Sequence, residues 1–399
     1  MKVLVISHMY PSTSSQVLGL FVHQQVKELQ NQGCAVKVIC PTQWAPFPIK
    51  YLSKEWKGYS DIPARQNREG IDVYYPRYLV FPKAFLFSSS GKRMYKGIRE
   101  LVGTLYKDFQ FDVIHAHVAL PDGFAAMMLN KRYNKPLVVT VHGADLYASI
   151  YINASCRKAI AKVFEEADKV VLVSAKLKEI AEASIGFTEK LIVISNGIDP
   201  QDISLGESTL ASKYVGHRVI LSVSSLIKRK GIGVNLRAIS RLRSKYPNLK
   251  YLVIGDGPES SLLRQLTRDL DLDCQVEILG ELPHKLVMDY MALADIFSLP
   301  SWNESFGMVY IEAAMHAKPV IACEGEGISD IFENNKTAIF VKPKNVESLV
   351  EGMDFLLGNP EKARELGERA KKLVLENYTW EKNARKYIEI YRELIASHG

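Results

Sequence analysis

The chain has 399 residues, 47% of them hydrophobic and 24% charged, which is typical of a soluble globular protein with two domains. No apolar run reaches the ~20 residues that a membrane-spanning helix needs, and residues 1–6 have the pattern of a first strand rather than of a signal peptide. The five cysteines form no C-x-x-C pair, which argues against a disulfide framework and favours a reducing, cytoplasmic location.

The net charge of +7 is unevenly distributed. Residues 1–200 hold 25 basic and 17 acidic residues, whereas the remainder holds 26 and 27. A basic first half suggests an anionic partner such as a membrane surface, a lipid-phosphate acceptor or a nucleic acid, although an ordinary solvated surface explains it equally well. Nucleic-acid binding is disfavoured because the basic residues do not cluster with a recognisable motif.

The first half alternates short β-branched runs with amphipathic helices, which predicts a doubly wound parallel sheet. Its first turn carries a single glycine, Gly19, just before a helix over Phe21–Gln32, and it lacks the G-x-G-x-x-G of a dinucleotide site. The predicted strands are Val3–Ile6, Val36–Ile39, Val113–His115, Leu137–Val141, Val170–Val173 and Leu191–Ile194.

Residues 41–107 are predicted to be irregular, aromatic and basic. The apolar run Phe81–Phe87 precedes a basic segment that contains Lys92, Arg93, Lys96 and Arg99. A basic helix with apolar neighbours can lie on an anionic membrane, but a helix that buries one face on the sheet is the favoured interpretation.

Histidines end two of the predicted strands. His142 follows the strand Leu137–Val141 and precedes Gly143, a position better suited to chemistry than to packing. His115 and His117 end a neighbouring strand, where a site role for His117 and a packing role are equally plausible. A turn at Ser195–Pro200 then closes the first half, with Gly197 supplying the backbone freedom for a sharp exit.

The second half restarts the α/β alternation, and two such sheets in one chain are a usual setting for a small-molecule site. Lys228, Arg229 and Lys230 stand between the first strand and Gly231, where a phosphate-binding role is favoured over a solvated charge run. Gly255 and Gly257 follow the second strand and let the backbone approach a ligand or simply make the turn. The predicted strands are Val219–Val223, Tyr251–Ile254, Val276–Leu279, Ile296–Leu299, Val320–Cys323 and Ala338–Val341.

Two glutamates flank the start of a predicted helix after Ile296–Leu299. Glu304 lies on its approach and Glu312 in its second turn. If the whole segment were helical they would lie roughly 12 Å and about 80° apart. That is too far for the paired carboxylates of a glycosidase, roughly 5–10 Å apart. Residues 305–307 between them offer helix N-terminal amides, which favour phosphate. Hydroxyl-binding groups at both ends and phosphate-binding groups in the middle describe a site for a nucleotide sugar.

The segment from Pro300 to Ala322, PSWNESFGMVYIEAAMHAKPVIA, resembles the GT4 family of retaining glycosyltransferases. The HG-x-D stretch at His142, the SNGID turn and the GDGP turn at Gly255 resemble the same family. The resemblance implies a GT-B fold, in which two Rossmann-like doubly wound α/β domains face a cleft. It implies the domains 1–198 and 217–377, a link over 199–216, and a closing helix over 378–399 that packs on the first domain, with Thr379 as a plausible N-cap.

The resemblance also implies roles for individual residues. Lys230 would bind the donor diphosphate, Glu304 the donor sugar, Glu312 the ribose, and His142 would line the reaction centre, so that His142, Glu304 and Lys230 are the expected catalytic residues. The expected donor site comprises Gly19, Ser225, Arg229, Lys230, Gly255, Gly257, Glu304, Phe306, Gly307, Met308 and Glu312.

The chain departs from the family pattern at two places. Ser225 stands at the usual arginine position, so that Arg229 or Lys228 would have to supply the missing charge. In the loop after Cys323, Glu326 replaces a glycine and Asp330 replaces a glutamate.

The expected activity is transfer of a sugar, with retention, from a nucleotide sugar (a UDP-sugar is favoured) to a glycan or lipid-linked acceptor hydroxyl. No metal or other cofactor is expected beyond the donor, and peripheral contact with an anionic membrane is the alternative to ordinary packing for the basic stretch of the first domain. The alternatives are a GT-B epimerase of UDP-sugars and a non-catalytic module that binds nucleotides or nucleic acid.

Overall fold

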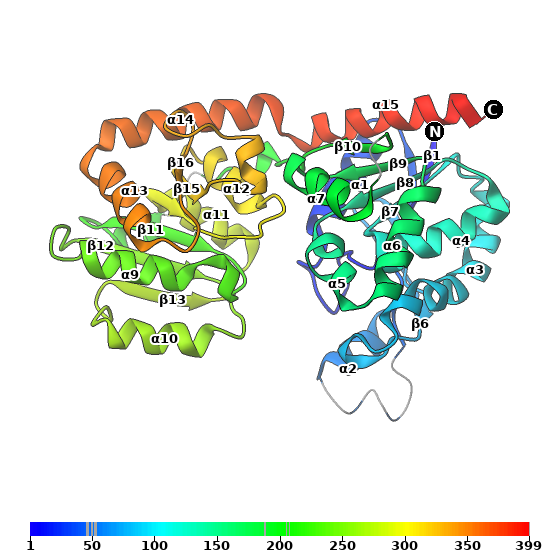
Figure 1. Ribbon diagram of the computed structural model, residues 1–399, viewed down its shortest axis with the longest axis horizontal. Helices are drawn as coiled ribbons and strands as arrows, with labels where there is room; N and C mark the ends of the chain where they lie inside the picture. The colour runs from blue at the N-terminus through cyan, green and yellow to red at the C-terminus, as the bar shows by residue number, and fades with distance from the viewer. Residues whose placement is uncertain are drawn as a thin grey trace. The chain divides into compact units, whose positions relative to one another are not determined.

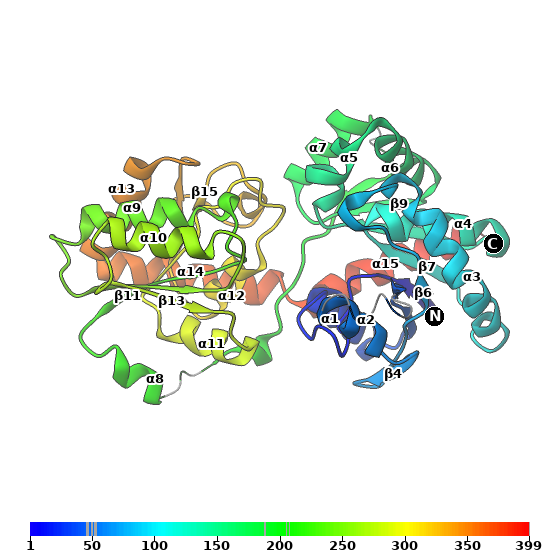
Figure 2. The same ribbon diagram turned by 90° about the horizontal axis from the view of Figure 1, so that it is seen from below.

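The computed structural model describes residues 1–44, 48, 51, 54–186, 189–204, 206 and 208–398. The chain forms two compact units. Unit 1 comprises Met1–Asn196 together with Trp380–Gly399, and unit 2 comprises Gly197–Thr379. Each unit has its own sheet with helices on both faces (Figures 1 and 2), so that both have the doubly wound α/β architecture predicted from the sequence.

The sheet of unit 1 has eight strands in the order β10-β9-β8-β7-β1-β2-β5-β4. All neighbouring pairs are parallel except β4 with β5. Val3 of β1 pairs with Val113 of β7 and with Val36 of β2, which places the carboxyl ends of these central strands at one edge. The strands are β1 (Lys2–Ile6), β2 (Ala35–Ile39), β4 (Arg65–Arg68), β5 (Ile71–Tyr74), β7 (Val113–His117), β8 (Leu137–Val141), β9 (Lys169–Leu172) and β10 (Leu191–Val193).

Helices cover both faces of this sheet (Figure 2). On one face, α15 lies beside α1, and its Tyr387, Ile388 and Tyr391 enter the core formed with β1 and β2. The last helix of the chain therefore completes the unit in which the chain begins. The helices are α1 (Leu20–Asn31), α3 (Ser90–Asp108), α4 (Phe124–Tyr133), α5 (Ile150–Ile152), α6 (Ala154–Glu166), α7 (Ala175–Ile185) and α15 (Trp380–His398).

The prediction that residues 41–107 are irregular was wrong in part. Residues 65–74 form an antiparallel hairpin at the sheet edge, and its outer strand, Arg65–Arg68, is too polar to show strand periodicity. The stretch also contains β3 (Thr42–Gln43), which pairs with β6 (Arg77–Tyr78), and α2 (Lys54–Asp61). Residues 45–47, 49–50 and 52–53 of this stretch lie outside the described residues.

The basic helix of this stretch, α3, buries one apolar face. Met94, Ile98 and Val102 have no exposed surface, which confirms that this face packs inside unit 1 rather than facing solvent. No helix in the described ranges of the chain has both the length and the apolar character needed to span a bilayer.

Unit 2 has a six-stranded parallel sheet in the order β13-β12-β11-β14-β15-β16. The strands are β11 (Arg218–Val223), β12 (Leu249–Ile254), β13 (Val276–Gly280), β14 (Ile296–Ser298), β15 (Val320–Cys323) and β16 (Ile339–Val341). The helices are α8 (Ser208–Lys213), α9 (Ile232–Leu242), α10 (Ser260–Asp269), α11 (His284–Leu293), α12 (Met308–Met315), α13 (Val346–Gly358) and α14 (Pro360–Asn377).

Both sheets reverse their strand order once, between β1 and β7 in unit 1 and between β11 and β14 in unit 2. At such a reversal, successive connections leave towards opposite faces of the sheet, and ligands of open α/β sheets bind beside the carboxyl ends of these strands. The twelve strands predicted from the sequence are confirmed, with ends that differ by at most two residues.

Candidate functional site

The strand-order reversal of unit 2 is bridged by an ion pair. Lys230 lies in the short 3-10 turn Lys228–Lys230 after β11, and Glu304 lies in the loop after β14. The Lys230 Nζ lies 2.5 Å from Glu304 Oε2, and Ser301 Oγ donates to the same oxygen over 2.7 Å. The side chains are only 14% and 9% exposed, so the structure brings together two of the predicted catalytic residues.

This environment keeps Glu304 ionised. Burial alone would raise the pKa of its carboxyl group, but the charge and hydrogen bond of Lys230, with the hydrogen bond of Ser301, outweigh burial and lower it. The charge of Arg229 acts in the same direction. The pair therefore presents a fixed positive and a fixed negative group at the edge of the sheet.

A second carboxylate holds the loop that carries Glu304. Glu326, which follows β15 and is 6% exposed, accepts the Glu304 main-chain N–H over 2.8 Å. The next residue, Gly327, donates its N–H to the Glu304 carbonyl over 3.2 Å. Glu326, one of the residues at which the chain departs from the GT4 pattern, thus fixes the main chain of the predicted sugar-binding glutamate.

The loops after β11 and β12 pack tightly on each other. Gly255 has a φ of 130°, and a Cβ at this position would lie 1.9 Å from the Ser224 carbonyl oxygen, so only glycine fits. A Cβ at Gly257 would lie 2.6 Å from the Leu226 carbonyl oxygen. The predicted donor-site glycines therefore bring two loops of the sheet edge into contact.

Ser225 and Arg229 differ in their contacts with the loop that carries Glu304. Ser225 is exposed in the loop after β11, whereas Arg229 Nη1 donates to the Asn303 carbonyl over 2.9 Å. The guanidinium of Arg229 consequently stands beside the Glu304 loop. Of the two cations considered as substitutes for the usual arginine, Arg229 is the one tied to this loop.

The helix α12 begins at Met308, with Gly307 in a left-handed conformation before it and Phe306 buried beside it. Residues 300–307 are not helical, so the separation estimated for a continuous helix between the two glutamates does not apply. Glu312 lies in the second turn of α12, as predicted. Burial raises the pKa of Glu312, the charge of His284 opposes this shift, and that of Asp202 adds to it. Glu312 and Glu304 therefore face different sets of charges.

In unit 1, the predicted site residue His142 is paired with His117. His117 Nδ1 and His142 Nε2 lie 3.0 Å apart, and the rings are nearly parallel at 8°. The other nitrogens of both rings are buried and have no hydrogen-bond partner within the described residues. Burial lowers the pKa of His142 to about 3, so the ring is neutral at physiological pH. The pair thus leaves two buried ring nitrogens at a strand end that no described residue satisfies.

Comparison with known proteins decides the family. The family model for group 1 glycosyl transferases matches residues 211–373, and that for Glycosyltransferase Family 4 matches residues 18–202. A glycosyltransferase assigned to teichuronic acid biosynthesis, TuaC of Bacillus subtilis, is 31% identical over 359 residues, 88% of each chain. The chain belongs to the GT4-type, group 1 glycosyltransferases.

Solved structures support the fold of this glycosyltransferase. The match with sucrose-phosphate synthase from Thermosynechococcus elongatus covers 100% of each chain, with a TM-score of 0.81 and 20% identity. Anabaena HepE, solved in complex with UDP and glucose, covers 99% of this chain and 100% of its own, with a TM-score of 0.75 and 17% identity. At such identities the likeness shows the fold alone, which is GT-B.

Gly19 of the glycosyltransferase lies against the first turn of unit 1. Its φ is 69°, and a Cβ would lie 2.2 Å from the Met9 carbonyl oxygen. The predicted donor-site glycine therefore closes the loop that follows β1 onto the start of α1.

The interpretation of His115 as a strand-end residue was wrong. His115 lies in the middle of β7, is fully buried, and bonds Thr140 Oγ1 over 2.8 Å and Tyr391 OH over 2.7 Å. The His115 ring stacks on Tyr387 of α15 at 5.0 Å, which places it in the core between β7 and α15. His115 is a packing residue, and only His117 reaches the site.

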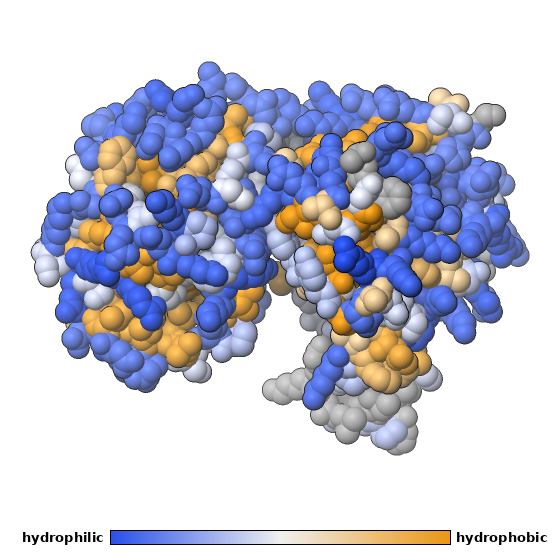
Figure 3. Space-filling model, in the orientation of Figure 1, coloured by the Kyte–Doolittle hydropathy of each residue, from blue (hydrophilic) through white to orange (hydrophobic). Residues whose placement is uncertain are grey.

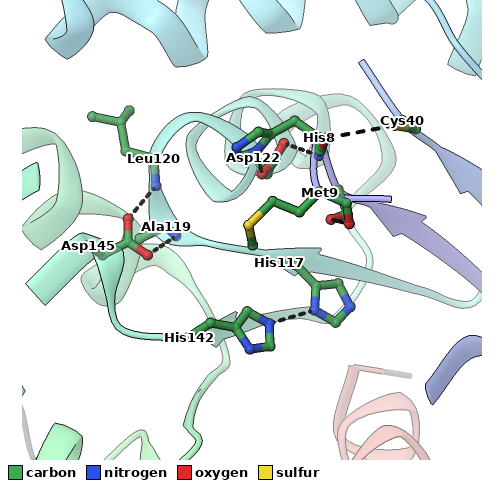
Figure 4. A network of polar contacts seen from close by, with 10 residues as sticks. His8, Met9, Cys40, His117, Ala119, Leu120, Asp122, His142 and Asp145 are labelled. Atoms are coloured by element: carbon green, nitrogen blue, oxygen red, sulfur yellow. Dashed lines mark hydrogen bonds and ion pairs between the residues drawn. The ribbon is translucent and has the colours of Figure 1, made fainter. Parts of the chain in front are cut away.

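Sequence reasoning missed His8, Asp122 and Asp145, which form a polar network at the same sheet edge (Figure 4). His8 Nδ1 lies 2.5 Å from Asp122 Oδ2, and Asp145 accepts the main-chain N–H groups of Ala119 and Leu120 over 3.0 and 3.1 Å. Only His8 lies within two residues of a predicted strand end, the signal used for His142, whereas Asp122 and Asp145 lie five and four residues beyond β7 and β8. Asp145 stands in the HG-x-D stretch but was given no role.

Proposed function

We propose that this glycosyltransferase moves a sugar from a UDP-sugar to an acceptor hydroxyl with retention of anomeric configuration. The observation that carries the proposal is the Lys230–Glu304 pair across the strand-order reversal of unit 2. It combines a cation for a diphosphate with a carboxylate for sugar hydroxyls at the position where open α/β sheets bind ligands.

The donor would use groups that the pair leaves free. A lysine ammonium has three donors, so the bond to Glu304 leaves two for phosphate oxygens. Both bonds to the Glu304 carboxylate go to Oε2, which leaves Oε1 to accept from a sugar hydroxyl. The main-chain amides at Gly307 and Met308, at the start of α12, would add donors for phosphate.

Two further residues of unit 2 complete the proposed donor site: Arg229, next to Lys230, would face the diphosphate, and Glu312 would bind the ribose. In unit 1, the His117–His142 pair is assigned to the donor sugar, with its unpartnered ring nitrogens as the supporting observation. The positive charges of Lys230 and Arg229 would stabilise the leaving diphosphate, so the proposed reaction needs no metal ion. Undiminished transfer in the presence of excess EDTA is the expected result.

Retention would follow from a front-face displacement. The Glu304 carboxylate is engaged by Lys230 and Ser301, which makes it a poor covalent nucleophile. The acceptor oxygen would form the new bond to the anomeric carbon as the bond from that carbon to the phosphate oxygen breaks, and the acceptor proton would pass to the departing phosphate.

The acceptor side of the proposal concerns a glycan or lipid-linked acceptor at an anionic membrane. Phe85 and Leu86 are 64% and 51% exposed in the loop before α3, and Figure 3 shows apolar residues gathered low on the drawn face of unit 1. Arg93 holds this loop, because it donates to the Leu79 and Leu86 carbonyls over 2.9 and 3.1 Å and stacks on Phe81 at 4.8 Å. Exposed Lys83, Lys92 and Lys96 surround it with positive charge.

Vesicle flotation tests this membrane contact. The protein should float with phosphatidylglycerol vesicles and not with phosphatidylcholine vesicles, and F85S/L86S should reduce flotation. The control Y151S/I152S removes two other exposed apolar side chains, 70% and 43% exposed, and should float like the wild type. Equal flotation of all variants would contradict a role for this loop.

Thermal unfolding against UDP, GDP, ADP and their glucose or mannose derivatives, followed by assays of UDP release, tests the main proposal. A ligand at a hundred times its dissociation constant stabilises the folded state by ~2.7 kcal/mol. Stabilisation by UDP and one UDP-sugar, with sugar transfer that retains configuration, is the expected result. Stabilisation by GDP or ADP compounds alone would show that the donor carries a nucleotide other than UDP. Formation of an epimerised UDP-sugar without acceptor would favour an epimerase over a transferase. If none of the compounds stabilised the protein, the proposed donor site would be contradicted.

A further inference from the structure

The strand-order reversal of unit 1 is also bridged by an ion pair, formed by His8 and Asp122. His8 follows β1, and Asp122 lies in the connection after β7. Both oxygens of Asp122 are used: Oδ2 lies 2.5 Å from the His8 ring nitrogen Nδ1, and Oδ1 accepts the His8 main-chain N–H over 3.1 Å (Figure 4). The two bonds fix both the position and the orientation of the imidazole.

The two side chains differ in exposure. The Asp122 carboxylate is fully buried, whereas the His8 side chain is 34% exposed. Because the carboxylate receives the Nδ1 side of the ring, the other nitrogen, Nε2, is the ring's remaining hydrogen-bonding atom. Burial alone would lower the pKa of His8, but the charge and hydrogen bond of Asp122, together with the charge of Asp145, outweigh burial and raise it.

The connection that carries Asp122 is itself held in place. Asp145, fully buried after β8, accepts the N–H groups of Ala119 and Leu120. Gly123 packs against this connection, where a Cβ would lie 2.9 Å from Val163 and 3.1 Å from the Val118 carbonyl oxygen. A buried acid on a supported loop, directed at a half-exposed histidine, is the arrangement of a preorganised site.

The pair is separate from the His117–His142 pair. Ile6 of β1 pairs with Ala116 of β7, and His117 of β7 pairs with Thr140 of β8, so His8 and His142 end strands that lie two positions apart. Neighbouring strands are about 4.8 Å apart, which separates the two main chains by roughly 10 Å. Met9 is drawn between the two pairs in Figure 4. The edge of unit 1 thus carries two polar pairs, and their outer members, His8 and His142, follow strands that lie two positions apart.

We infer that His8 binds the acceptor: its Nε2 forms the hydrogen bond to the acceptor hydroxyl that attacks the donor sugar, and Asp122 acts through His8 as a positioning residue. This inference rests on the function proposed above, since it needs a donor held elsewhere in the enzyme. Because His142 is assigned to the donor sugar, His8, which follows a strand two positions away, is available for the acceptor.

Two isosteric substitutions separate this role from a purely structural one. In H8N the amide nitrogen stands near the position of Nδ1, so the bond to Asp122 is kept and Nε2 is lost. In H8Q the amide reaches the position of Nε2 while the bond to Asp122 is weakened. A structural role predicts that H8N is the milder variant, whereas an acceptor-binding role predicts that H8Q is.

The experiment uses UDP-glucose as donor and a panel of octyl and p-nitrophenyl glycosides as acceptor probes. The probe with the highest UDP release by the wild type is used for the kinetics. We expect H8N to lower kcat/KM for this acceptor roughly ten- to a hundredfold, the effect of losing a hydrogen bond to a charged group, with H8Q retaining more activity. The shift of the melting temperature by UDP should remain that of the wild type in both variants, while the melting temperature itself should fall more in H8Q, which weakens the bond to the buried Asp122.

H217N, at an exposed histidine of unit 2, is the matched control and should behave as the wild type. Unchanged acceptor kcat/KM in H8N, or a loss in H8Q that exceeds the loss in H8N, would overturn the inference. A reduced UDP shift in H8N would also overturn it, because it would place His8 on the donor side. Failure of the proposed function is a different result: the wild type itself would show no UDP shift, or no transfer to any probe.

Discussion

The two units place an ion pair at the same point of the same fold, but with different side chains. In unit 2 the base Lys230 follows β11 and the acid Glu304 follows β14, and in unit 1 the base His8 follows β1 and the acid Asp122 follows β7. Both pairs have an N–O distance of 2.5 Å. An ammonium group is a compact point charge with three donors and suits a diphosphate, whereas an imidazole nitrogen can donate or accept and suits a hydroxyl.

The parallel extends to a third residue. The loop that bears each acid is held by a buried carboxylate after the next strand of the sheet: Glu326 after β15 accepts from Glu304, and Asp145 after β8 accepts from Ala119 and Leu120. The fold therefore supplies the same support twice, and the residue chosen as base distinguishes the two sites.

The largest effect is expected from breaking the unit 2 pair. K230M should lower kcat about 10²–10³-fold, because it removes a donor to the leaving diphosphate. It should also reduce the free energy of unfolding by about 3–5 kcal/mol, because it leaves the Glu304 carboxylate buried without its counter-ion. Urea unfolding and steady-state UDP release measure the two effects.

The double variant K230M/E304Q separates stability from catalysis. Removing both charges should restore most of the free energy of unfolding while leaving kcat low. Recovery of activity in the double variant would contradict the assignment of Lys230 to the diphosphate.

The next largest loss of stability is expected from substituting the glycines at which loops pack closely at the carboxyl edge of each sheet. G255A and G19A should each lower the free energy of unfolding by about 2–5 kcal/mol, since a methyl group would meet a carbonyl oxygen at 1.9 or 2.2 Å in a left-handed backbone. G280A and G33A also have positive φ but have nothing within 4 Å, and should cost only about 1–2 kcal/mol. Equal losses in all four variants, measured by urea unfolding, would show that the close approaches do not matter.

A smaller effect is expected from the supporting carboxylates. E326A and D145A should each lower the free energy of unfolding by about 1–3 kcal/mol, because they leave buried main-chain N–H groups unpaired. E326Q keeps an acceptor oxygen and should lose less than E326A. If the parallel between the units holds, E326A raises the KM for the donor and D145A raises that for the acceptor probe; the opposite assignment would contradict it.

The smallest expected effect is on the pH dependence of the free energy of unfolding. Burial, and to a lesser extent the charge of His142, lowers the pKa of His115 to about 3, below the ~6.5 of an unfolded histidine. Between these values the unfolded chain binds more protons, so the stability from neutral His115 is complete above pH 6.5 and is lost as the pH falls towards 3. H115Q should flatten the dependence of unfolding free energy on pH by up to ~1.4 kcal/mol per unit in this window. An unaltered slope in H115Q would contradict a neutral buried His115.

Local signals in the sequence predicted the strands and the donor-side loops, because the groups near Glu304 and Gly255 follow recognisable strands. The two ion pairs could not be predicted, because they depend on the order of strands in each sheet, which local sequence patterns do not reveal. Lys230 and Glu304 are 74 residues apart and His8 and Asp122 are 114 apart, and each pair meets only because β11 adjoins β14 and β1 adjoins β7. The polar edge hairpin at residues 65–74 was missed for a different reason, since its outer strand has no apolar alternation.

The central claim is that the unit 2 pair serves the donor and the unit 1 pair serves the acceptor. The most direct measurement is the UDP-induced shift in melting temperature of the wild type, K230M and H8N under identical conditions. The account predicts that the wild type and H8N show the same shift and that K230M shows little or none. A shift that persists in K230M and disappears in H8N would reverse the two assignments and contradict the account.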